Sequence, residues 1–262
     1  MSVFHDQLNR EVNLPEVPKR IISVVPSQTE LLFYLGLDVE VVGITKFCIH
    51  PADKFKTVTK VGGTKQLEID QIRALNPDLV IANKEENTQL QIEELMNICP
   101  VWISDVHNFD DALEMIRSIG TITNRRTEAN ILLADITTSF NKLILQALNQ
   151  RVVYFIWRKP YMAAGPNTFI SSMLQKCGLI NAVKASRYPE ISAQELTEIN
   201  PDLIFLSSEP YPFKQKHADE LQELLPSSQI ILVNGELFSW YGSRLLDAPA
   251  YFRQLINNLT IN

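Results

Sequence analysis

A short segment that occurs twice constrains this fold more than any other feature of the chain. Asn-Pro-Asp-Leu-Val-Ile occupies residues 76–81, and Asn-Pro-Asp-Leu-Ile-Phe occupies residues 200–205. Each copy follows an amphipathic segment, at residues 69–75 and 193–199. A helix, an Asn-Pro-Asp turn and a buried strand in the same order twice predict two lobes of one design.

Apolar, β-branched runs alternate with helical patterns through both halves of the chain. The expected strands are residues 20–25, 41–44, 79–82, 101–103, 151–156, 203–206 and 230–233. Further helices are expected at residues 30–36, capped by Ser27 or Thr29, and at 85–97, 109–119 and 168–177. Strands that alternate with helices form crossover units, so the sheets should be mostly parallel. The sequence therefore predicts an α/β fold of two Rossmann-like lobes, residues 1–123 and 150–262.

Residues 124–149, between the lobes, contain neither Gly nor Pro. Their apolar side chains recur every three or four positions, which predicts one continuous amphipathic helix. About 26 residues at ~1.5 Å each would make a rod of roughly 39 Å. Two lobes joined by one stiff helix leave a cleft between them, and such clefts are favoured ligand sites.

The composition excludes several classes of protein. The 262 residues are 45% hydrophobic and carry a formal net charge of −6, which is typical of a soluble globular protein. An acidic chain lacks the basic face of nucleic-acid-binding proteins, so no nucleic-acid partner is expected. No apolar run approaches the ~18–20 residues that a membrane span needs, so no membrane insertion is expected.

The cysteines and histidines show no spacing typical of a metal site or a disulfide framework. Cys48, Cys99 and Cys177 are far apart and form no CxxC pair, which favours reduced cysteines that pack in the core. The four histidines form no HxH or HxxxH pattern. We therefore expect no metal ligands and no cofactor of the protein's own.

The start of the chain leaves its location open. Residues 1–12 contain no basic start, no apolar stretch and no small-residue cleavage site, so no signal peptide is expected within this chain. Either the protein is cytoplasmic, or its export signal has been removed from the sequence given.

Several loops that follow the predicted strands are rich in aromatic and cationic side chains. The aromatic candidates are Trp157, Tyr161, Tyr211, Trp240 and Tyr241, and the cationic ones are Lys65, Lys84, Arg158, Lys159 and Arg244. Gly62 and Gly63 add backbone freedom for a close approach to a ligand. In open parallel sheets, ligands bind beyond the carboxyl ends of the strands. The set is suited to a large, flat and partly anionic ligand.

Motifs of catalysis are missing from the sequence. It contains no GxSxG, no GxxxxGK[ST], no GxGxxG after a strand and no HExxH. An enzyme remains the alternative hypothesis, because Lys84-Glu85-Glu86 and Ser207-Ser208-Glu209 follow corresponding strands. Close Lys–Glu pairs with few aromatic side chains would favour an intracellular enzyme for an anionic small molecule.

Four segments carry a resemblance to a known family. They are Arg-Ile-Ile-Ser-Val-Val-Pro-Ser-Gln-Thr-Glu-Leu-Leu-Phe-Tyr-Leu-Gly-Leu at 20–37, Val-Gly-Ile-Thr-Lys at 42–46, Val-Gly-Gly-Thr at 61–64 and both Asn-Pro-Asp-Leu segments. The chain resembles the class III periplasmic substrate-binding proteins of ABC importers, and it is most similar to their cobalamin-binding branch. The resemblance implies a monomeric, non-enzymatic receptor outside the cytoplasm that binds cobalamin, haem or a ferric siderophore.

The resemblance also implies roles for individual residues. Phe47, Tyr188 and Trp240 fall near ligand contacts of the family, as does Tyr161 or Met162. Thr64 and Asn83 stand where a well-known cobalamin binder has Trp. In the family, one acidic residue on each lobe docks on the importer permease. These residues would be Asp70 and, one position away from the strict repeat register at Gln194, Glu195.

The leading hypothesis is therefore a receptor that holds a metal chelate between two lobes. Its aromatic rings would stack on the flat face of the ligand, while Lys65, Arg158, Lys159 and Arg244 would offset negative groups at the rim. The sequence leaves the choice among cobalamin, haem and a ferric siderophore open.

Overall fold

In the computed structural model, which describes residues 2–143 and 148–260, the internal contacts divide the chain into two units. The first unit contains the chain through Val106, together with Asp110–Thr138 and Tyr241–Leu246. The second unit contains His107–Phe109, Ser139–Trp240 and the chain from Asp247 onward. Each unit contains one five-stranded sheet.

The sheet of the first unit has the doubly wound order β5-β4-β3-β8-β9. Its members are β3 (Ile21–Ser23), β4 (Val41–Ile44), β5 (Thr59–Lys60), β8 (Leu79–Asn83) and β9 (Val101–Ser104). All neighbouring pairs are parallel. The chain extends the sheet on one side of β3 and then on the other, so the switch point lies between β3 and β8.

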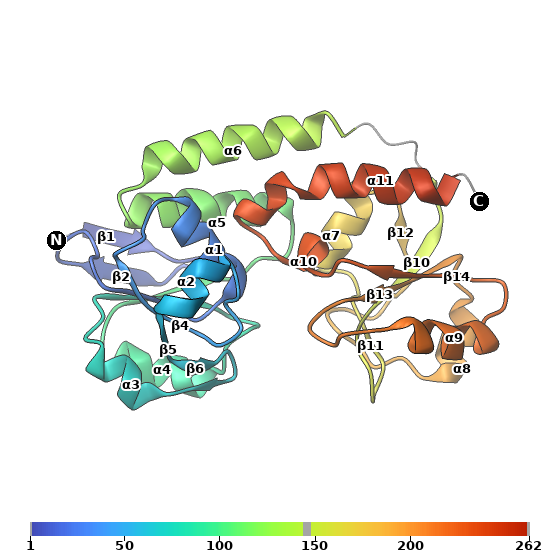
Figure 1. Cartoon of the computed structure of the whole chain (residues 1–262), viewed down its shortest axis with the longest axis horizontal. Coiled ribbons are helices and arrows are strands. Elements are labelled where there is room, and N and C mark those ends of the chain that lie inside the picture. Colours follow the sequence, from blue (N-terminus) through green and yellow to red (C-terminus); the bar gives the residue numbers. More distant parts are fainter. Residues whose placement is uncertain (1, 144–147, 261–262) are drawn as a thin grey trace. The chain divides into compact units, whose positions relative to one another are not determined.

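Helices cover both faces of this sheet (Figure 1). They are α1 (Pro26–Tyr34), α2 (Ala52–Thr57), α3 (Ile69–Ala74), α4 (Gln89–Met96) and α5 (Phe109–Ile122). Alternate strand residues such as Ile22, Val80 and Val101 pack with Ile72 of α3 and Leu95 of α4 in one buried cluster. Side chains alternate between the faces of a strand, so the intervening residues face the other layer. Two small hairpins complete the unit, β1 (Ser2–His5) with β2 (Glu11–Leu14) and β6 (Gly62–Gly63) with β7 (Gln66–Leu67).

The second unit is built around β10, which pairs with three other strands. The strands are β10 (Arg151–Trp157), β11 (Met162–Ala163), β12 (Ile180–Asn181), β13 (Leu203–Ser207) and β14 (Gln229–Val233), of which only β11 is antiparallel to its partner. The helices are α7 (Phe169–Lys176), α8 (Ala193–Ile199), α9 (Gln215–Leu224), α10 (Glu236–Ser239) and α11 (Ala248–Thr260). The α/β fold with mostly parallel sheets is confirmed, and each predicted strand is present.

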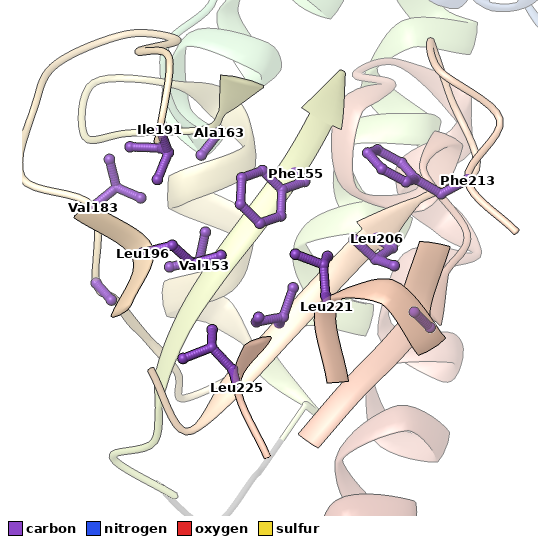
Figure 2. Close-up of a cluster of buried hydrophobic side chains, with 13 residues drawn as sticks. Val153, Phe155, Ala163, Val183, Ile191, Leu196, Leu206, Phe213, Leu221 and Leu225 are labelled. Carbon is purple, nitrogen blue, oxygen red and sulfur yellow. The ribbon is translucent and has the colours of Figure 1, made fainter. Parts of the chain in front are cut away.

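The core of the second unit lies on both faces of its sheet. On one face, Val153, Phe155 and Leu206 pack against Leu196 of α8 and Leu221 of α9 (Figure 2). On the other face, the ring of Tyr154 lies 5.3 Å from that of Phe238, which in turn lies 4.8 Å from the ring of Phe252. The alternation of side chains along β10 therefore supplies two apolar layers.

The repeated Asn-Pro-Asp segment has the same structural role in both units. Asn76 and Asn200 have left-handed φ angles of 44° and 43°. Asn tolerates this conformation better than other residues with a side chain, so it ends a helix where the chain must turn. Asp78 then accepts a hydrogen bond from the Arg20 amide at 3.0 Å, and Asp202 accepts one from the Arg151 amide at 2.7 Å. The repeat thus ties the start of one strand to the start of its neighbour.

The predicted helix at residues 124–149 begins later and ends earlier in the structure. Asn124 has a φ angle of 57°, which separates α5 from α6 (Arg126–Asn141). At the other end, the Leu143 amide donates to the Phe140 carbonyl at 3.1 Å, a tight turn that closes the helix. Residues 144–147 lie outside the described residues. The 16 residues of α6 span ~24 Å, against the ~39 Å predicted, because apolar spacing fixes a helix face and not its ends.

Two further helix starts differ from prediction. Pro26 opens α1, and neither Ser27 nor Thr29 caps it, because both lie within its first turn. Helix α4 starts at Gln89 and not at residue 85. None of the helices within the described residues combines the length and the hydropathy that a membrane span requires.

Candidate ligand-binding site

A buried polar cluster lies at the carboxyl ends of the central strands of the first unit. Ser104 ends β9, Asn83 ends β8, and Gln28 lies in the first turn of α1 after β3. The Ser104 hydroxyl accepts hydrogen bonds from the amide of Gln28 and, at 3.0 Å, from the amide of Asn83. This edge is where open parallel sheets bind ligands.

Asn83 shapes the turn that follows β8. Its Oδ1 accepts hydrogen bonds from the backbone amides of Glu85 at 2.8 Å and Glu86 at 3.0 Å. Asn87 then accepts from the Asn83 backbone amide at 2.8 Å and donates to the Val24 carbonyl at 3.1 Å. This side-chain-to-backbone bonding holds residues 85–88 out of the helix that the sequence predicts at 85–97. Asn83, predicted as a ligand contact, is buried and supports the turn.

Phe47 presents an exposed ring beyond the end of β4. Half of the surface of Phe47 is accessible to solvent (50%). The Lys46 ammonium lies 5.3 Å from the centroid of the Phe47 ring. A Cβ at Gly63 would come within 3.1 Å of the ring, so glycine permits this close packing. The Gly62–Gly63 pair therefore supports the β6–β7 hairpin and the position of Phe47.

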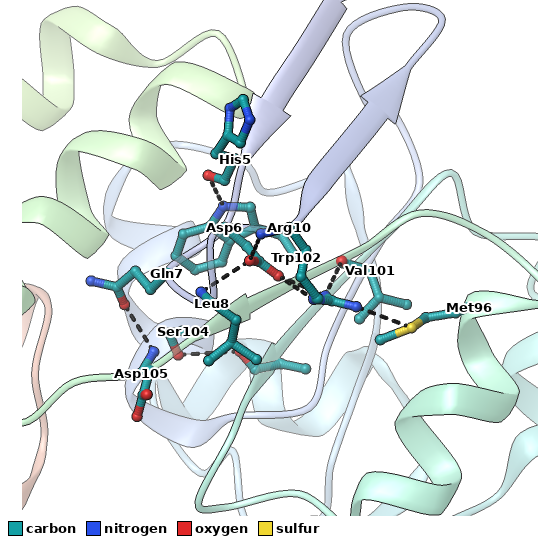
Figure 3. Close-up of polar contacts among 11 residues, drawn as sticks. His5, Asp6, Gln7, Leu8, Arg10, Met96, Val101, Trp102, Ser104 and Asp105 are labelled. Atoms are coloured by element: carbon teal, nitrogen blue, oxygen red, sulfur yellow. Dashed lines mark hydrogen bonds and ion pairs between the residues drawn. The ribbon is translucent and has the colours of Figure 1, made fainter.

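Both predicted lysines of this edge are held by neighbouring groups. Lys84 forms an ion pair with Asp105 at 2.6 Å, and Lys65 donates to the Glu85 carbonyl. Asp105 is itself positioned by the N-terminal hairpin, since its backbone amide donates to Gln7 Oε1 at 3.0 Å (Figure 3). Each ammonium group therefore has a partner within the first unit.

The hairpin is fastened to the outer strand β9 by its own polar contacts. Buried Asp6 accepts from Arg10 Nη2 at 2.6 Å, and Arg10 also donates to the Val101 carbonyl at 3.2 Å (Figure 3). The indole of Trp102 donates to the His5 carbonyl at 3.2 Å. These contacts cover the edge of β9, an arrangement that protects a sheet edge from further strand pairing.

A segment from the end of the chain completes the first unit. Tyr241 donates to Glu86 at 2.9 Å, and Arg244 Nε donates to Glu30 at 3.1 Å. Both residues were predicted as ligand contacts. The structure gives them partners within the protein, and Tyr241 is buried with 6% of its surface accessible.

Four predicted site residues lie together in the second unit. Trp157, which is exposed, contacts Tyr211 edge-on at 5.7 Å between ring centroids. Tyr161 accepts a hydrogen bond from Arg158 at 3.3 Å. Arg158 also pairs with Glu220. Phe213, which the sequence analysis did not select, stacks with Tyr161 and contacts Tyr211 at 4.8 Å. An aromatic and cationic cluster therefore follows β10 and β13.

The remaining predicted ligand residues differ in exposure. Trp240 follows α10 and is buried with 6% of its surface accessible. Tyr188 is half-buried in the loop between β12 and α8. Lys159 is exposed and has a left-handed φ angle of 68°.

The two predicted docking carboxylates are on exposed helix starts. The side chain of Asp70 is 97% exposed and pairs with Arg73 at 2.7 Å. Glu195 accepts from the Ser192 backbone amide at 2.8 Å and closes a capping box at the start of α8. The backbone hydrogen bond from Ser192 lowers the pKa of the Glu195 carboxyl, so the group carries its charge at neutral pH.

The candidate nucleophiles among the described residues are cysteine thiols and the Ser207 hydroxyl, and none of them is shown to be activated. Burial raises the pKa of the Cys48 thiol and raises that of Cys99 to about 12, so neither forms a thiolate at neutral pH. The Ser207 hydroxyl accepts from Tyr154 at 3.1 Å and donates to the Glu209 carbonyl. No group of three or more His, Cys, Asp or Glu side chains within residues 2–143 and 148–260 could hold a metal ion.

A surface hollow of about 430 Å³ lies away from the strand ends. It is lined by residues 10–13 of the hairpin and residues 96–101 between α4 and β9. Pro100 and Val101 mark the amino end of β9, the opposite end to the one where parallel sheets bind ligands.

A family model described as periplasmic binding protein matches residues 21–226. The chain belongs to the periplasmic binding protein family. The match includes both Asn-Pro-Asp segments and the strand ends that carry the polar and aromatic clusters. The members of this family are binding proteins, which agrees with the resemblance drawn from the sequence.

Curated relatives of this periplasmic binding protein match three quarters or more of the chain. The vitamin B12-binding protein of Pectobacterium carotovorum subsp. carotovorum (strain PC1) is 25% identical over 252 residues, which cover 93% of this chain and 89% of that protein. The cobalamin-binding protein of Halobacterium salinarum (strain ATCC 29341 / DSM 671 / R1) is 27% identical over 214 residues, 76% of this chain and 56% of that protein.

Solved structures share the fold of this periplasmic binding protein. The vitamin B12-binding protein BtuF of Vibrio cholerae has a TM-score of 0.76 at 20% identity and covers 95% of this chain and 100% of its own. The haem-binding protein BhuT in complex with two haems has a TM-score of 0.79 at 22% identity, over 92% of this chain and 99% of its own. At these identities the likeness establishes the two-lobed α/β fold.

Sequence reasoning missed most of the buried polar side chains at the edge of the first sheet. Gln28, Asn87 and Ser104 take part in the polar cluster, yet only Asn83 was selected. One signal was present, since Ser27-Gln28-Thr29 is a polar run directly after a buried strand. The partner of Gln28 could not be read from it, because Ser104 lies 76 positions further along the chain.

Proposed function

We propose that this protein is the substrate-binding receptor of an ABC importer, with cobalamin as its ligand. Haem and a ferric siderophore are the other candidates of the same kind. The proposal is supported by the family and by the curated relatives, several of which are named vitamin B12-binding or cobalamin-binding proteins. Under this proposal, the protein acts on the outer side of the cytoplasmic membrane. It acts there as a monomer.

The observation that carries the proposal is a pair of exposed aromatic rings at strand ends. Phe47 is 50% accessible in the first unit, and Trp157 is 41% accessible in the second. Exposed rings of this size cost free energy in water, and a flat ligand face would bury them. A corrin ring offers such a face, and stacking on it supplies affinity.

Cationic and polar side chains next to the rings would set the orientation of the ligand. Lys46 lies beside Phe47, Lys65 donates to the Glu85 carbonyl in the turn after β8, and Arg158 lies beside Tyr161. In this arrangement, the rings bind the face while the polar groups meet the rim. No bond of the ligand needs to be made or broken, so the protein acts as a carrier and not as an enzyme.

The importer permease is the proposed partner. Asp70 and Glu195 lie in the first turns of α3 and α8, the helices that precede the two Asn-Pro-Asp segments, one in each unit. Exposed carboxylates are suited to pair with arginines of a partner. Glu195 also closes a capping box, so it is held in one orientation, whereas Asp70 pairs with Arg73.

Thermal unfolding of the purified chain tests the ligand. We expect cyanocobalamin at ~100 times its Kd to stabilise the protein by ~2.7 kcal/mol, which raises the Tm by about 5–10 °C. Hemin and a panel of ferric siderophores are the comparison ligands. A shift with hemin or a siderophore alone would replace cobalamin as the ligand. The absence of any shift would contradict the receptor proposal and favour the enzyme alternative.

A further inference from the structure

Two residues in the described part of the chain have a backbone conformation that does not suit their side chains. Eight residues other than glycine have a left-handed φ angle there, and six of them are Asn. The two exceptions are Lys159, with a φ angle of 68°, and Arg187, with one of 67°. Asn and Gly tolerate this conformation, whereas it crowds the Cβ of other residues. Backbone strain of this kind is concentrated at functional sites.

The local structure accounts for Lys159 but not for Arg187. Lys159 lies in the short turn between β10 and β11, and a tight reversal of this kind favours a left-handed residue. Arg187 lies in the longer connection between β12 and α8. There the Gly165 amide donates to the Arg187 carbonyl at 2.7 Å, and the Arg187 amide donates to the Pro166 carbonyl at 3.2 Å. Two backbone hydrogen bonds therefore hold residue 187.

The backbone around Arg187 leaves little room for another conformation. A Cβ at Gly165 would clash with the Ala185 carbonyl oxygen, so the connection packs directly against this glycine. The surrounding chain thus imposes the left-handed conformation, and Asn or Gly at position 187 would adopt it with less strain than Arg does. The reason for an arginine must lie in its side chain.

The side chain of Arg187 contacts a histidine of the same unit. Arg187 Nη1 lies 3.4 Å from Nδ1 of His107, in the segment His107–Phe109. A guanidinium has donors and no acceptor, so Nδ1 of His107 accepts and the imidazole carries its proton on Nε2. Both residues are half-buried, so each keeps part of its surface accessible. The pair places a cation beside a second N–H donor.

The chain positions of this pair adjoin candidate ligand residues. Tyr188, a predicted ligand contact, follows Arg187 directly and is also half-buried, while Ser186 on its other side is exposed. His107 comes shortly after the carboxyl end of β9, which is Ser104. A ligand that reaches Tyr188 therefore passes close to Arg187.

We propose that Arg187 binds an oxyanion at the rim of the ligand, with His107 as the residue that positions its guanidinium. The fork of N–H donors matches the oxygens of a phosphate or a carboxylate, and partial burial strengthens such a contact. The inference rests on the proposed function, under which the oxyanion is the phosphodiester of cobalamin. Haem would present a carboxylate instead.

Cyanocobalamin and dicyanocobinamide test this proposal, because they share the corrin ring but only cyanocobalamin carries the phosphodiester. The Kd of each is measured by calorimetry for the wild type and for Arg187→Asn. We expect Arg187→Asn to weaken cyanocobalamin binding by about threefold to tenfold and to change the Kd of dicyanocobinamide by less than about twofold. The Tm without ligand should stay the same or rise, because Asn relieves the left-handed strain.

Two further variants separate a specific contact from general charge. Lys184→Asn is the matched control, since Lys184 is exposed in the same connection and the change removes the same charge. It should leave both Kd values within about twofold of the wild type. Arg187→Lys keeps the charge but not the fork, so it should recover only part of the affinity for cyanocobalamin. An arginine that serves only internal packing predicts the opposite for Arg187→Asn, a lower Tm and an unchanged Kd.

The outcomes distinguish this inference from the proposed function. If cyanocobalamin binds and Arg187→Asn keeps its Kd, or weakens both corrinoids equally, the ligand stands and the oxyanion site is overturned. If neither corrinoid binds the wild type, cobalamin is wrong as the ligand, and hemin with its dimethyl ester becomes the test pair, with the loss expected for hemin alone. Binding of none of these ligands would overturn both proposals. Should Arg187→Asn not fold, Arg187→Gly replaces it with the same expectations.

Discussion

Tyr241 and Glu86 are 155 positions apart in the chain, and the phenol of one donates to the carboxylate of the other at 2.9 Å. The bond attaches a segment from the end of the chain to the turn after β8. The segment Tyr241–Leu246 belongs to the first unit although the residues around it belong to the second. The candidate site of the first unit is therefore assembled from both halves of the sequence.

Removal of the hydrogen bond between Tyr241 and Glu86 should lower the stability of the first unit. Tyr241→Phe keeps the buried ring but leaves the carboxylate of Glu86 without this donor. We expect a loss of about 1–2 kcal/mol in the free energy of unfolding, measured by urea titration. Tyr34→Phe is the control, since Tyr34 is exposed and should change stability by less than ~0.5 kcal/mol. Equal effects of the two changes would contradict the structural role of Tyr241.

The left-handed Asn residues of the repeat should tolerate Gly but not Ala. In Asn76→Ala and Asn200→Ala, a residue without a polar side chain must adopt a φ angle near 44°. We expect each change to lower the free energy of unfolding by about 1–2 kcal/mol. Asn76→Gly and Asn200→Gly should stay within ~0.5 kcal/mol of the wild type, because glycine adopts this conformation freely. Chemical unfolding of the four variants gives the comparison. A loss with Gly as large as with Ala would show that the Asn side chain, and not its backbone angle, matters.

His217 should make stability depend on pH on the acid side of neutrality. Burial against Tyr211 and Phe213 lowers the pKa of His217 below 6.5, and nearby Arg158 adds to the shift. The unfolded chain then binds a proton at this position more readily than the folded one. Stability is complete above pH 6.5 and falls as the pH drops toward the folded pKa.

The variant His217→Asn removes this titration while keeping an acceptor for the Lys214 amide, which His217 Nδ1 accepts at 3.0 Å. Urea midpoints at pH 7 and pH 5 should differ more for the wild type than for the variant. An identical pH dependence in the two proteins would rule out His217 as its source.

The exposed rings should matter for affinity and not for folding. Phe47→Ala and Trp157→Ala should each weaken cyanocobalamin binding by about threefold to tenfold, since an aromatic contact is worth ~0.5–1.5 kcal/mol. The Tm without ligand should change little, because both side chains are exposed. Calorimetry and thermal unfolding provide the two readouts. Val39→Ala, at an exposed position, is the control, and an unchanged Kd in both ring variants would remove these rings from the site.

Docking on the importer should depend on Asp70 without any effect on the ligand. The side chain of Asp70 is 97% exposed, so Asp70→Asn should leave the Tm and the Kd for cyanocobalamin unchanged. Uptake of radiolabelled cyanocobalamin by cells with the cognate importer should fall severalfold, because an interface charge pair is lost. Glu198→Gln on α8 is an exposed control. Normal uptake with Asp70→Asn would exclude this carboxylate from the interface.

The sequence by itself determined the architecture of each unit. The alternation of apolar runs and helices indicated parallel sheets, and the strands lie where it placed them. The repeated Asn-Pro-Asp segment worked as a local signal, because the left-handed φ of Asn76 and Asn200 depends on the residue itself and its neighbours. The exposed candidates Phe47 and Trp157 were also accessible to sequence reasoning, since Phe47 lies in the loop after the predicted strand 41–44 and Trp157 comes next after the predicted strand 151–156.

Only the tertiary structure decided which polar groups meet. Asn83, which stays a predicted ligand contact, bonds Ser104 and the following turn, while Tyr241 and Arg244 pair with Glu86 and Glu30. The apolar period of residues 124–149 did not show that α6 ends at Asn141. Spacing along a chain specifies periodicity, whereas hydrogen-bond partners are set by strand order and chain reversal. The hydrogen bond between Gln28 and Ser104 belongs to that second kind of information, because it joins two residues that are 76 positions apart in the sequence.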